Sequence, residues 1–133
     1  MSAKHDDLCK LIRLYLSQVG ILSIDTPTHG ILFDPRGKPV RSSGKGKLDI
    51  HACAPVTMYD KQGTPQLTGV YIAIDAKVGK DKLHDEQLNY AKAVNKRGGI
   101  AFQAYSVDDV RNMLILKGII SDDTTPNAET KPG

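Results

Sequence analysis

The chain of 133 residues contains few cysteines, no tryptophan and no long hydrophobic run. Cys9 and Cys53 form neither a C-x-x-C pair nor another metal-ligand spacing, which favours free thiols in a reducing compartment over a disulfide framework. No apolar stretch approaches the roughly 20 residues of a membrane span, and the first residues, MSAKHDDLCK, lack the apolar core of a signal peptide. We therefore expect no membrane association and a cytoplasmic location.

The overall composition is that of an ordinary globular protein, with 40% hydrophobic and 25% charged residues. The net charge of +3 is too small to indicate a nucleic-acid partner by itself, so the distribution of charge matters more. We expect a single domain over residues 1–120. The final segment, 121–133, has almost no apolar residues and is expected to be a disordered tail.

The pattern of apolar residues and turn signals predicts alternating helices and strands. The order α-β-β-β-β-α-β-α gives an α/β fold class, a compact mixed β-sheet flanked by helices. A mobile loop is expected over 36–47 and a long connection over 55–69. Ser106 to Asp109 resembles a capping box at a helix start. The expected elements are a helix over 4–19, strands over 21–25, 30–33, 48–54 and 70–77, a helix over 83–97, a strand over 100–105 and a helix over 106–118.

The stretch GVYIAIDAKVG, residues 69–79, ends an apolar strand with two opposite charges. Strand side chains alternate between faces, so Tyr71, Ala73, Asp75 and Lys77 share one face. An isolated pair of this kind is usually a salt bridge at the margin of a sheet. The alternative is that Asp75 and Lys77 perform chemistry there.

The preceding strand supplies a second carboxylate. If residues 48–54 and 70–77 pair in antiparallel fashion with Ala54 beside Val70, then Asp49 lies opposite Asp75. Facing carboxylates repel each other unless a positive charge lies between them, and Mg²⁺ or Mn²⁺ with oxygen ligands suits that position better than Lys77 alone. The backbone carbonyl of Ala76 is a further candidate ligand.

These residues resemble the PD-(D/E)XK nuclease superfamily, and roughly residues 4–117 resemble its VRR-NUC branch, most strongly over 44–110. In that branch the (E/D)xK strand is followed by a glycine-containing turn and a helix carrying a glutamine, a position that Gln87 occupies here. The resemblance implies a restriction-endonuclease-like core and a stand-alone protein of bacterial or phage type. It also implies catalytic roles for Asp49, Asp75, Lys77 and Gln87, with Lys77 positioning the attacking water. Asp6 and Asp7 stand where relatives often carry a glutamate.

Two further residues share the strand face of Asp49. His51 and Cys53 make an Asp/His/Cys zinc cluster conceivable, but zinc sites usually have a fuller set of nitrogen and sulfur ligands. We therefore assign His51 a structural or supporting role. Two roles of Gln87 remain open: its side chain contacts the substrate, or it forms a hydrogen bond with a backbone group.

The run RGKPVRSSGKGK, residues 36–47, holds five basic residues and no acidic ones and leads directly to Asp49. Because Lys and Arg supply most protein contacts to phosphate, we expect this run to bind DNA at the mouth of the site. The candidate DNA-binding residues are Arg36, Lys38, Arg41, Lys45, Lys47 and Lys80.

The sequence thus predicts a Mg²⁺- or Mn²⁺-dependent endonuclease that hydrolyses DNA phosphodiester bonds. The resemblance implies a homodimer that cuts branched DNA, such as a four-way (Holliday) junction. Two other functions remain open at this point. The chain would be a non-catalytic DNA-binding module, or an interaction subunit, if the nuclease fold were kept without its chemistry.

Overall fold

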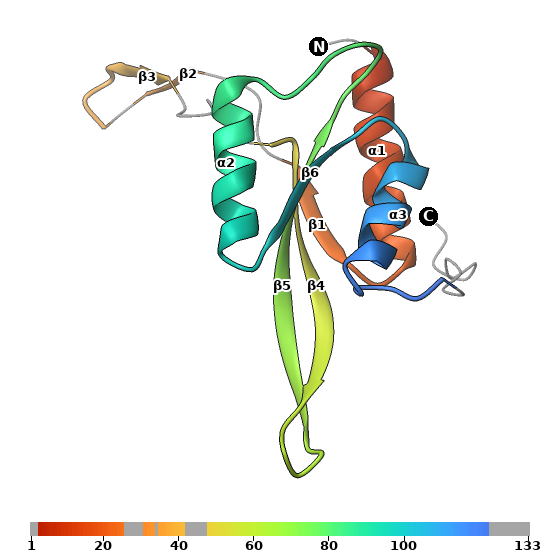
Figure 1. The fold of residues 1–133 in the computed structure, drawn as a ribbon. Coiled ribbons are helices and arrows are strands. Elements are labelled where there is room, and N and C mark those ends of the chain that lie inside the picture. The colour runs from red at the N-terminus through yellow and green to blue at the C-terminus, as the bar shows by residue number, and fades with distance from the viewer. Residues whose placement is uncertain (1–2, 26–30, 34, 42–47, 123–133) are drawn as a thin grey trace.

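The computed structural model of the chain describes residues 3–25, 31–33, 35–41 and 48–122 (Figure 1). Lys45, Lys47 and residues 123–133 of the expected tail lie outside this range. The elements are α1 (Ala3–Gln18), β1 (Leu22–Asp25), β2 (Ile31–Phe33), β3 (Pro39–Arg41), β4 (Ile50–Tyr59), β5 (Pro65–Ala76), α2 (Asp85–Lys96), β6 (Ile100–Ala104) and α3 (Val107–Leu116).

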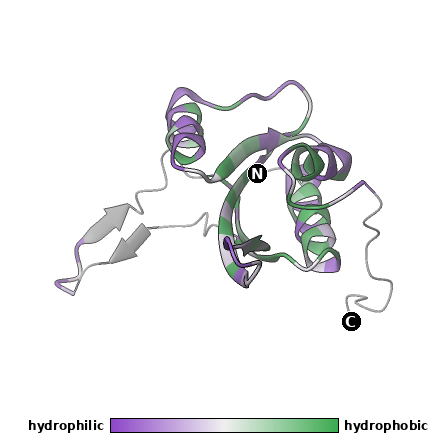
Figure 2. Cartoon of the chain, turned by 60° about the horizontal axis from the view of Figure 1, so that its bottom comes forward, coloured by the Kyte–Doolittle hydropathy of each residue, from purple (hydrophilic) through white to green (hydrophobic). Residues whose placement is uncertain are grey.

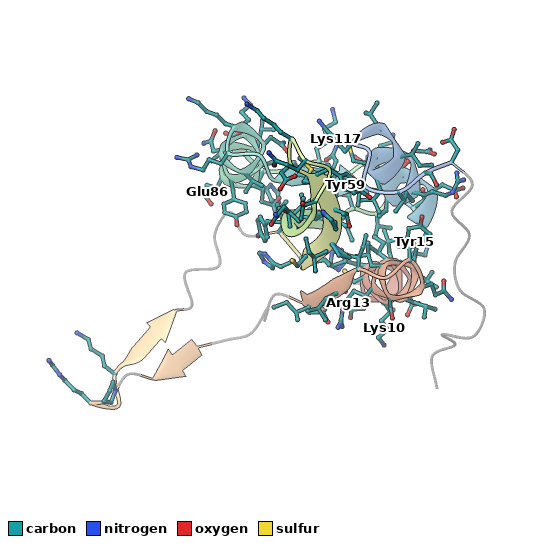
Figure 3. All side chains as sticks on the ribbon, turned by 90° about the horizontal axis from the view of Figure 1, so that it is seen from below. Lys10, Arg13, Tyr15, Tyr59, Glu86 and Lys117 are labelled. Carbon is teal, nitrogen blue, oxygen red and sulfur yellow. The ribbon has the colours of Figure 1, made fainter. Side chains whose placement is uncertain are left out.

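A four-stranded sheet in the order β1-β4-β5-β6 forms the centre of the molecule. β4 pairs with β1 and β5 in antiparallel fashion, whereas β6 runs parallel to β5. Helices α1 and α3 cover one face of the sheet and α2 covers the other, so that Tyr15 of α1 and Glu86 of α2 lie on opposite sides of the strands in Figure 3. The predicted fold class, a mixed sheet flanked by helices, is confirmed.

The helices follow from local sequence signals. The apolar stripe of α1 buries Ile12, Tyr15 and Leu16 against the sheet. The helix is followed by Gly20, whose φ of +83° is a left-handed conformation that favours glycine. At the start of α3 the Ser106 hydroxyl accepts a hydrogen bond from the Asp109 N–H at 3.1 Å, as the capping pattern predicts.

Two hydrophobic clusters hold the layers together, and Figure 2 shows the apolar residues along the strands and on α1 and α3. The larger cluster joins the sheet to α1 and α3. The smaller one lies under α2, where Ala73, Ala91 and Ala101 allow helix and sheet to approach closely. Leu48 belongs to this smaller cluster and Ile50 to the larger one. The strand predicted over 48–54 would place both side chains on one face by alternation, and that expectation is wrong for Leu48. Because β4 begins at Ile50, strand alternation does not extend back to Leu48.

The β4–β5 hairpin is much longer than the sequence suggested. The predicted connection over 55–69 is wrong, because β4 continues to Tyr59 and β5 begins at Pro65. Within the tight turn that joins them, Asp60 Oδ1 accepts hydrogen bonds from the N–H groups of Gln62 and Thr64, both at 2.9 Å. The hairpin extends beyond the helices at the lower end of Figure 1. Its exposed side chains carry little apolar alternation, which is why the pattern did not reveal it.

A second, two-stranded sheet pairs β2 with β3. The prediction of a loop throughout 36–47 is therefore wrong for residues 39–41, which form a strand opposite residues 31–33. Backbone hydrogen bonding to β2 supplies the order that composition alone did not indicate. The turn between these strands carries Arg36 and Lys38, both exposed.

Candidate functional site

A cavity of about 410 Å³ is lined by residues from the carboxyl end of β5 and from the amino-terminal ends of α1 and α2. These three ends lie in the upper part of Figure 1. The strand register that leads to it agrees with the prediction, since Ala54 pairs with Val70 and Ile50 pairs with Ile74. The next step along both strands brings Asp49 to Asp75. The lining residues are His5, Asp49, Asp75, Ala76, Lys77, Val78, Asp81, His84 and Gln87.

Asp75 and Lys77 form a buried ion pair in this cavity. Only 1% of the surface of Asp75 and 8% of that of Lys77 is exposed, and Lys77 Nζ lies 2.7 Å from Asp75 Oδ2. Charged groups are rarely buried to this degree without a partner or a function. The pair explains why an apolar strand ends in two charges, and both residues line the cavity.

Gln87 of α2 holds this pair in place. Its Nε2 donates to Asp75 Oδ1 at 3.3 Å, and its Oε1 accepts from Lys77 Nζ at 3.2 Å. The same Oε1 accepts from the His84 N–H at 3.1 Å at the start of α2. An amide has donors on one side and an acceptor on the other, so it fits between a carboxylate and an ammonium in one orientation. Gln87 thus satisfies a backbone group and also positions both charged residues.

Asp49 lies at the entrance to β4 and is fixed by two hydrogen bonds. Its Oδ2 accepts from the Ala76 N–H at 2.8 Å and lies 3.0 Å from His5 Nε2 on α1. The carboxyl group of Asp49 also lies close enough to that of Asp75 to interact with it. Two carboxylates from neighbouring strands therefore meet at one point, as the register predicts.

The surroundings of Asp75 favour its protonated form. Burial raises the pKa of Asp75 from 3.8 to about 6, and the negative charge of Asp49 adds to this rise, although Lys77 opposes it. A cation near the two carboxylates would stabilise the ionised form of Asp75, because its positive charge offsets both the cost of burying the carboxylate and the repulsion from Asp49.

The donor set fits a hard divalent cation. Asp75 Oδ2 is shielded from solvent and accepts no well-directed hydrogen bond, although it pairs with the Lys77 ammonium. An oxygen with an unused lone pair, beside a second carboxylate, is suited to Mg²⁺ or Mn²⁺. Ala76 also lines the cavity, which keeps its carbonyl among the candidate ligands.

His5 and Cys9 of α1 approach the site, although the sequence did not identify them as candidate site residues. His5 contacts Asp49, and Cys9 Sγ lies 4.0 Å from His5 Nδ1. Burial and the charges of Asp49 and other acids raise the pKa of the Cys9 thiol to about 12. Asp6 and Asp7, the acids considered from the sequence, are exposed on this helix. The i, i+4 spacing of His5 and Cys9 was the available signal, but it became informative only once α1 was placed against Asp49.

His51 takes part in a different contact. Its Nδ1 hydrogen-bonds the Tyr71 hydroxyl, which in turn lies 2.9 Å from the Tyr90 hydroxyl on α2. The Tyr71 and His51 rings stack with centroids 5.8 Å apart. This agrees with a structural role. The group of possible metal ligands around Asp49 in the described part of the chain contains His5 and Cys9, not His51 and Cys53.

The predicted DNA-binding residues are placed only in part. Arg36, Lys38 and Lys80 are exposed, Arg41 ends β3, and Lys45 and Lys47 lie outside the described residues. Lys80 follows β5 closely, in the turn between β5 and α2. Among these basic residues, Lys80 is therefore the one closest along the chain to a residue that lines the cavity.

Comparisons with protein-family models and with curated proteins give no match for this chain. Among the described residues, no helix combines the length and the apolar character needed to cross a membrane.

Proposed function

We propose that the chain is a metal-dependent DNA endonuclease of the VRR-NUC type, with its site in the cavity at the end of β5. The observation that carries this proposal is the cluster of Asp49, Asp75 and Lys77, in which a buried Asp–Lys pair meets a second carboxylate in an open cavity. A purely structural salt bridge at a sheet margin needs neither the second carboxylate nor the cavity. A cavity that contains an acid with a perturbed pKa beside other charged groups is characteristic of functional sites.

Asp49 and Asp75 would hold Mg²⁺ or Mn²⁺, together with the backbone carbonyl of Ala76. A bound divalent ion would stabilise charge on the phosphate in the transition state and lower the pKa of water. Both carboxylates are already oriented, Asp49 by the Ala76 N–H and Asp75 by Gln87. Such preorganisation reduces the cost of assembling the site when DNA binds.

Lys77 would position the water that attacks the phosphorus atom. Its ammonium is held by Asp75 and Gln87, so it occupies a defined position at the wall of the cavity. Hydrolysis then takes place in a single in-line step without a covalent intermediate. Gln87 acts as a positioning residue, because its amide contacts Asp75 and Lys77.

The DNA would be held through its phosphates by the exposed basic residues Arg36, Lys38 and Lys80, with Arg41, Lys45 and Lys47 extending the same set. The preference for branched DNA and the homodimer are proposed on the strength of the family resemblance. Backbone and shape recognition suit a domain of this size better than base readout.

The test is cleavage of a labelled four-way junction and a matched linear duplex in Mg²⁺, Mn²⁺ or EDTA. Lys77→Met keeps the aliphatic volume and removes the ammonium, and Lys61→Met in the exposed β4–β5 turn is the matched control. We expect metal-dependent cutting of the junction by the wild type and the control, and a loss of about 10²–10³-fold in Lys77→Met.

The other outcomes separate the alternatives. Equal cutting of both DNAs would retain the enzyme and discard the junction preference. Salt-sensitive binding without cutting in any metal would indicate a non-catalytic DNA-binding module. Neither binding nor cutting would leave an interaction subunit.

A further inference from the structure

A second group of metal-ligating side chains lies beside the proposed site, on the side of α1. His5 and Cys9 are four residues apart, so they project from the same face of the helix. Asp49 faces them from the start of β4. One ligand atom from each of the three residues lies within 4.8 Å of the other two.

His5 stands between the other two residues. Its Nε2 is 3.0 Å from Asp49 Oδ2, and its Nδ1 is 4.0 Å from Cys9 Sγ. Around a tetrahedral zinc ion with N or O ligands at about 2.0–2.1 Å and sulfur at about 2.3 Å, neighbouring ligand atoms are roughly 3.3–3.7 Å apart. The two separations above involve different ring nitrogens, and a zinc ion binds only one of them. With one ligand atom per residue the three atoms lie within 4.8 Å of one another, so they must approach by up to about an ångström to complete the geometry.

We propose that His5, Cys9 and Asp49 form a zinc-binding site. A thiolate, an imidazole and a carboxylate are the three ligand types that zinc uses, whereas Mg²⁺ avoids sulfur. The side chains of His5 and Asp49 are 15% and 18% exposed, which leaves the ion a route from solvent. On binding, the Cys9 thiol gives its proton to solvent, and water occupies the remaining coordination position.

The negative surroundings of the cluster favour a dication. Asp6 Oδ1 lies 3.7 Å from His5 Nδ1, and the carboxyl group of Asp75 lies beside that of Asp49. Among the residues that line the cavity, only the buried Lys77 ammonium, which is paired with Asp75, opposes this negative potential. A small, highly charged cation is the ligand that such a cluster attracts.

Asp49 is common to this cluster and to the proposed Mg²⁺ site. A carboxylate engaged by zinc on the side of His5 is drawn away from Asp75, so zinc lowers the occupancy of the catalytic metal. This consequence rests on the proposed function, whereas zinc binding itself does not. Zinc is therefore expected to inhibit cleavage by competing for Asp49.

The binding test uses the full chain, freed of metals with EDTA, kept reduced and without DNA. Zinc is titrated by calorimetry, and Co²⁺ is added in its place to seek the near-ultraviolet band of a thiolate–cobalt bond. Cys9→Ser removes one ligand, and Cys53→Ser is the matched control, because Cys53 is an exposed free cysteine on β4. Thermal melts check that both variants fold.

We expect one zinc ion per chain and a thiolate–cobalt band in the wild type and in Cys53→Ser. In Cys9→Ser the band should disappear and zinc affinity should fall by on the order of 10–100-fold or more. Affinity unchanged in Cys9→Ser, or reduced equally in Cys53→Ser, would overturn the site.

Competition is tested separately, with zinc added to the Mg²⁺-dependent cleavage reaction. Inhibition in the wild type and Cys53→Ser, and its relief in Cys9→Ser, would support the shared role of Asp49. Zinc that binds without inhibiting would refute the competition. Absence of cleavage in every metal would reject the proposed function and leave the calorimetric result standing.

Discussion

The two ends of the β4–β5 hairpin share one hydrogen-bonded ladder but differ in almost every other respect. At one end Ile50 pairs with Ile74, and both side chains are fully buried in the cluster that joins the sheet to α1 and α3. At the other end Thr57 pairs with Leu67, which is 78% exposed. The candidate site lies at the buried end, whereas the exposed end carries a tight turn built around Asp60.

The difference shows that burial, not strand pairing, gives the site its chemistry. Asp60 and Asp75 belong to the same hairpin, but Asp60 lies in an exposed turn, whereas Asp75 is enclosed between α2 and the sheet beside a second carboxylate, and this burial raises the pKa of Asp75. Layers on both faces of the sheet are therefore a condition for the proposed function. The following changes test this contrast.

Replacement of an aspartate should have opposite consequences at the two ends. Asp75→Asn removes a proposed metal ligand, so cleavage should fall by on the order of 10²–10³-fold. Asp60→Asn keeps the acceptor oxygen in the turn and should leave cleavage unchanged. Both rates are measured under single-turnover conditions in Mg²⁺, and equal activity of wild type and Asp75→Asn would refute the assignment.

Truncation of an apolar side chain should also depend on the end at which it is made. Ile74→Ala creates a cavity between the sheet and α1 and should lower the free energy of unfolding by about 2–5 kcal/mol. Leu67→Ala on the same strand should change it by no more than about 0.5 kcal/mol. Chemical denaturation of both variants measures the difference, and similar losses would show that the distal hairpin is covered in solution.

At the buried end of the hairpin, protonation of Asp75 should make the free energy of unfolding depend on pH. The pKa of Asp75 is raised from 3.8 to about 6, so the folded state holds a proton that the unfolded state has lost in this range. Stability is thus lost as the pH rises from about 4 to 6, by about 3 kcal/mol for a shift of roughly two pKa units, and remains lower above pH 6. Urea denaturation across pH 3.5–7 should show this fall in wild type and not in Asp75→Asn.

The same proton competes with the metal. Since Asp75 must be ionised to act as a ligand, Mn²⁺ affinity should fall about tenfold between pH 7 and pH 5. Calorimetric titration of wild type at three pH values measures this change. A pH-independent affinity would mean that Asp75 does not bind the ion.

The smallest effect is expected at the hairpin turn. Asp60→Ala removes the acceptor of two backbone hydrogen bonds in an exposed turn and should cost about 1 kcal/mol of stability. Cleavage should be unaffected. A loss of activity comparable to that of Asp75→Asn would show that the distal turn contacts the DNA, and a footprint of the bound junction would then locate it.

The helices could be predicted from the sequence because apolar spacing and glycines are local signals. The register of the central strands could be predicted because it follows from a single pair of residues. Apolar spacing defined α1, and glycines mark the ends of all three helices. Alignment of Ala54 with Val70 was enough to bring Asp49 to Asp75. The length of the hairpin could not be predicted from the sequence. Its distal part has no buried apolar face that would give an alternating pattern, and Pro55 and Pro65 suggested a loop.

The sequence by itself determined that a strand ends in Asp75 and Lys77, that Asp49 can face them, and that Gln87 lies on the helix that follows. Only the tertiary structure decided that Lys77 is buried, that Gln87 bridges it to Asp75, and that His5 and Cys9 reach Asp49. These last contacts join residues 40 or more positions apart in the chain. They depend on how α1 packs against the sheet, which the sum of many weak apolar contacts determines and no short motif records.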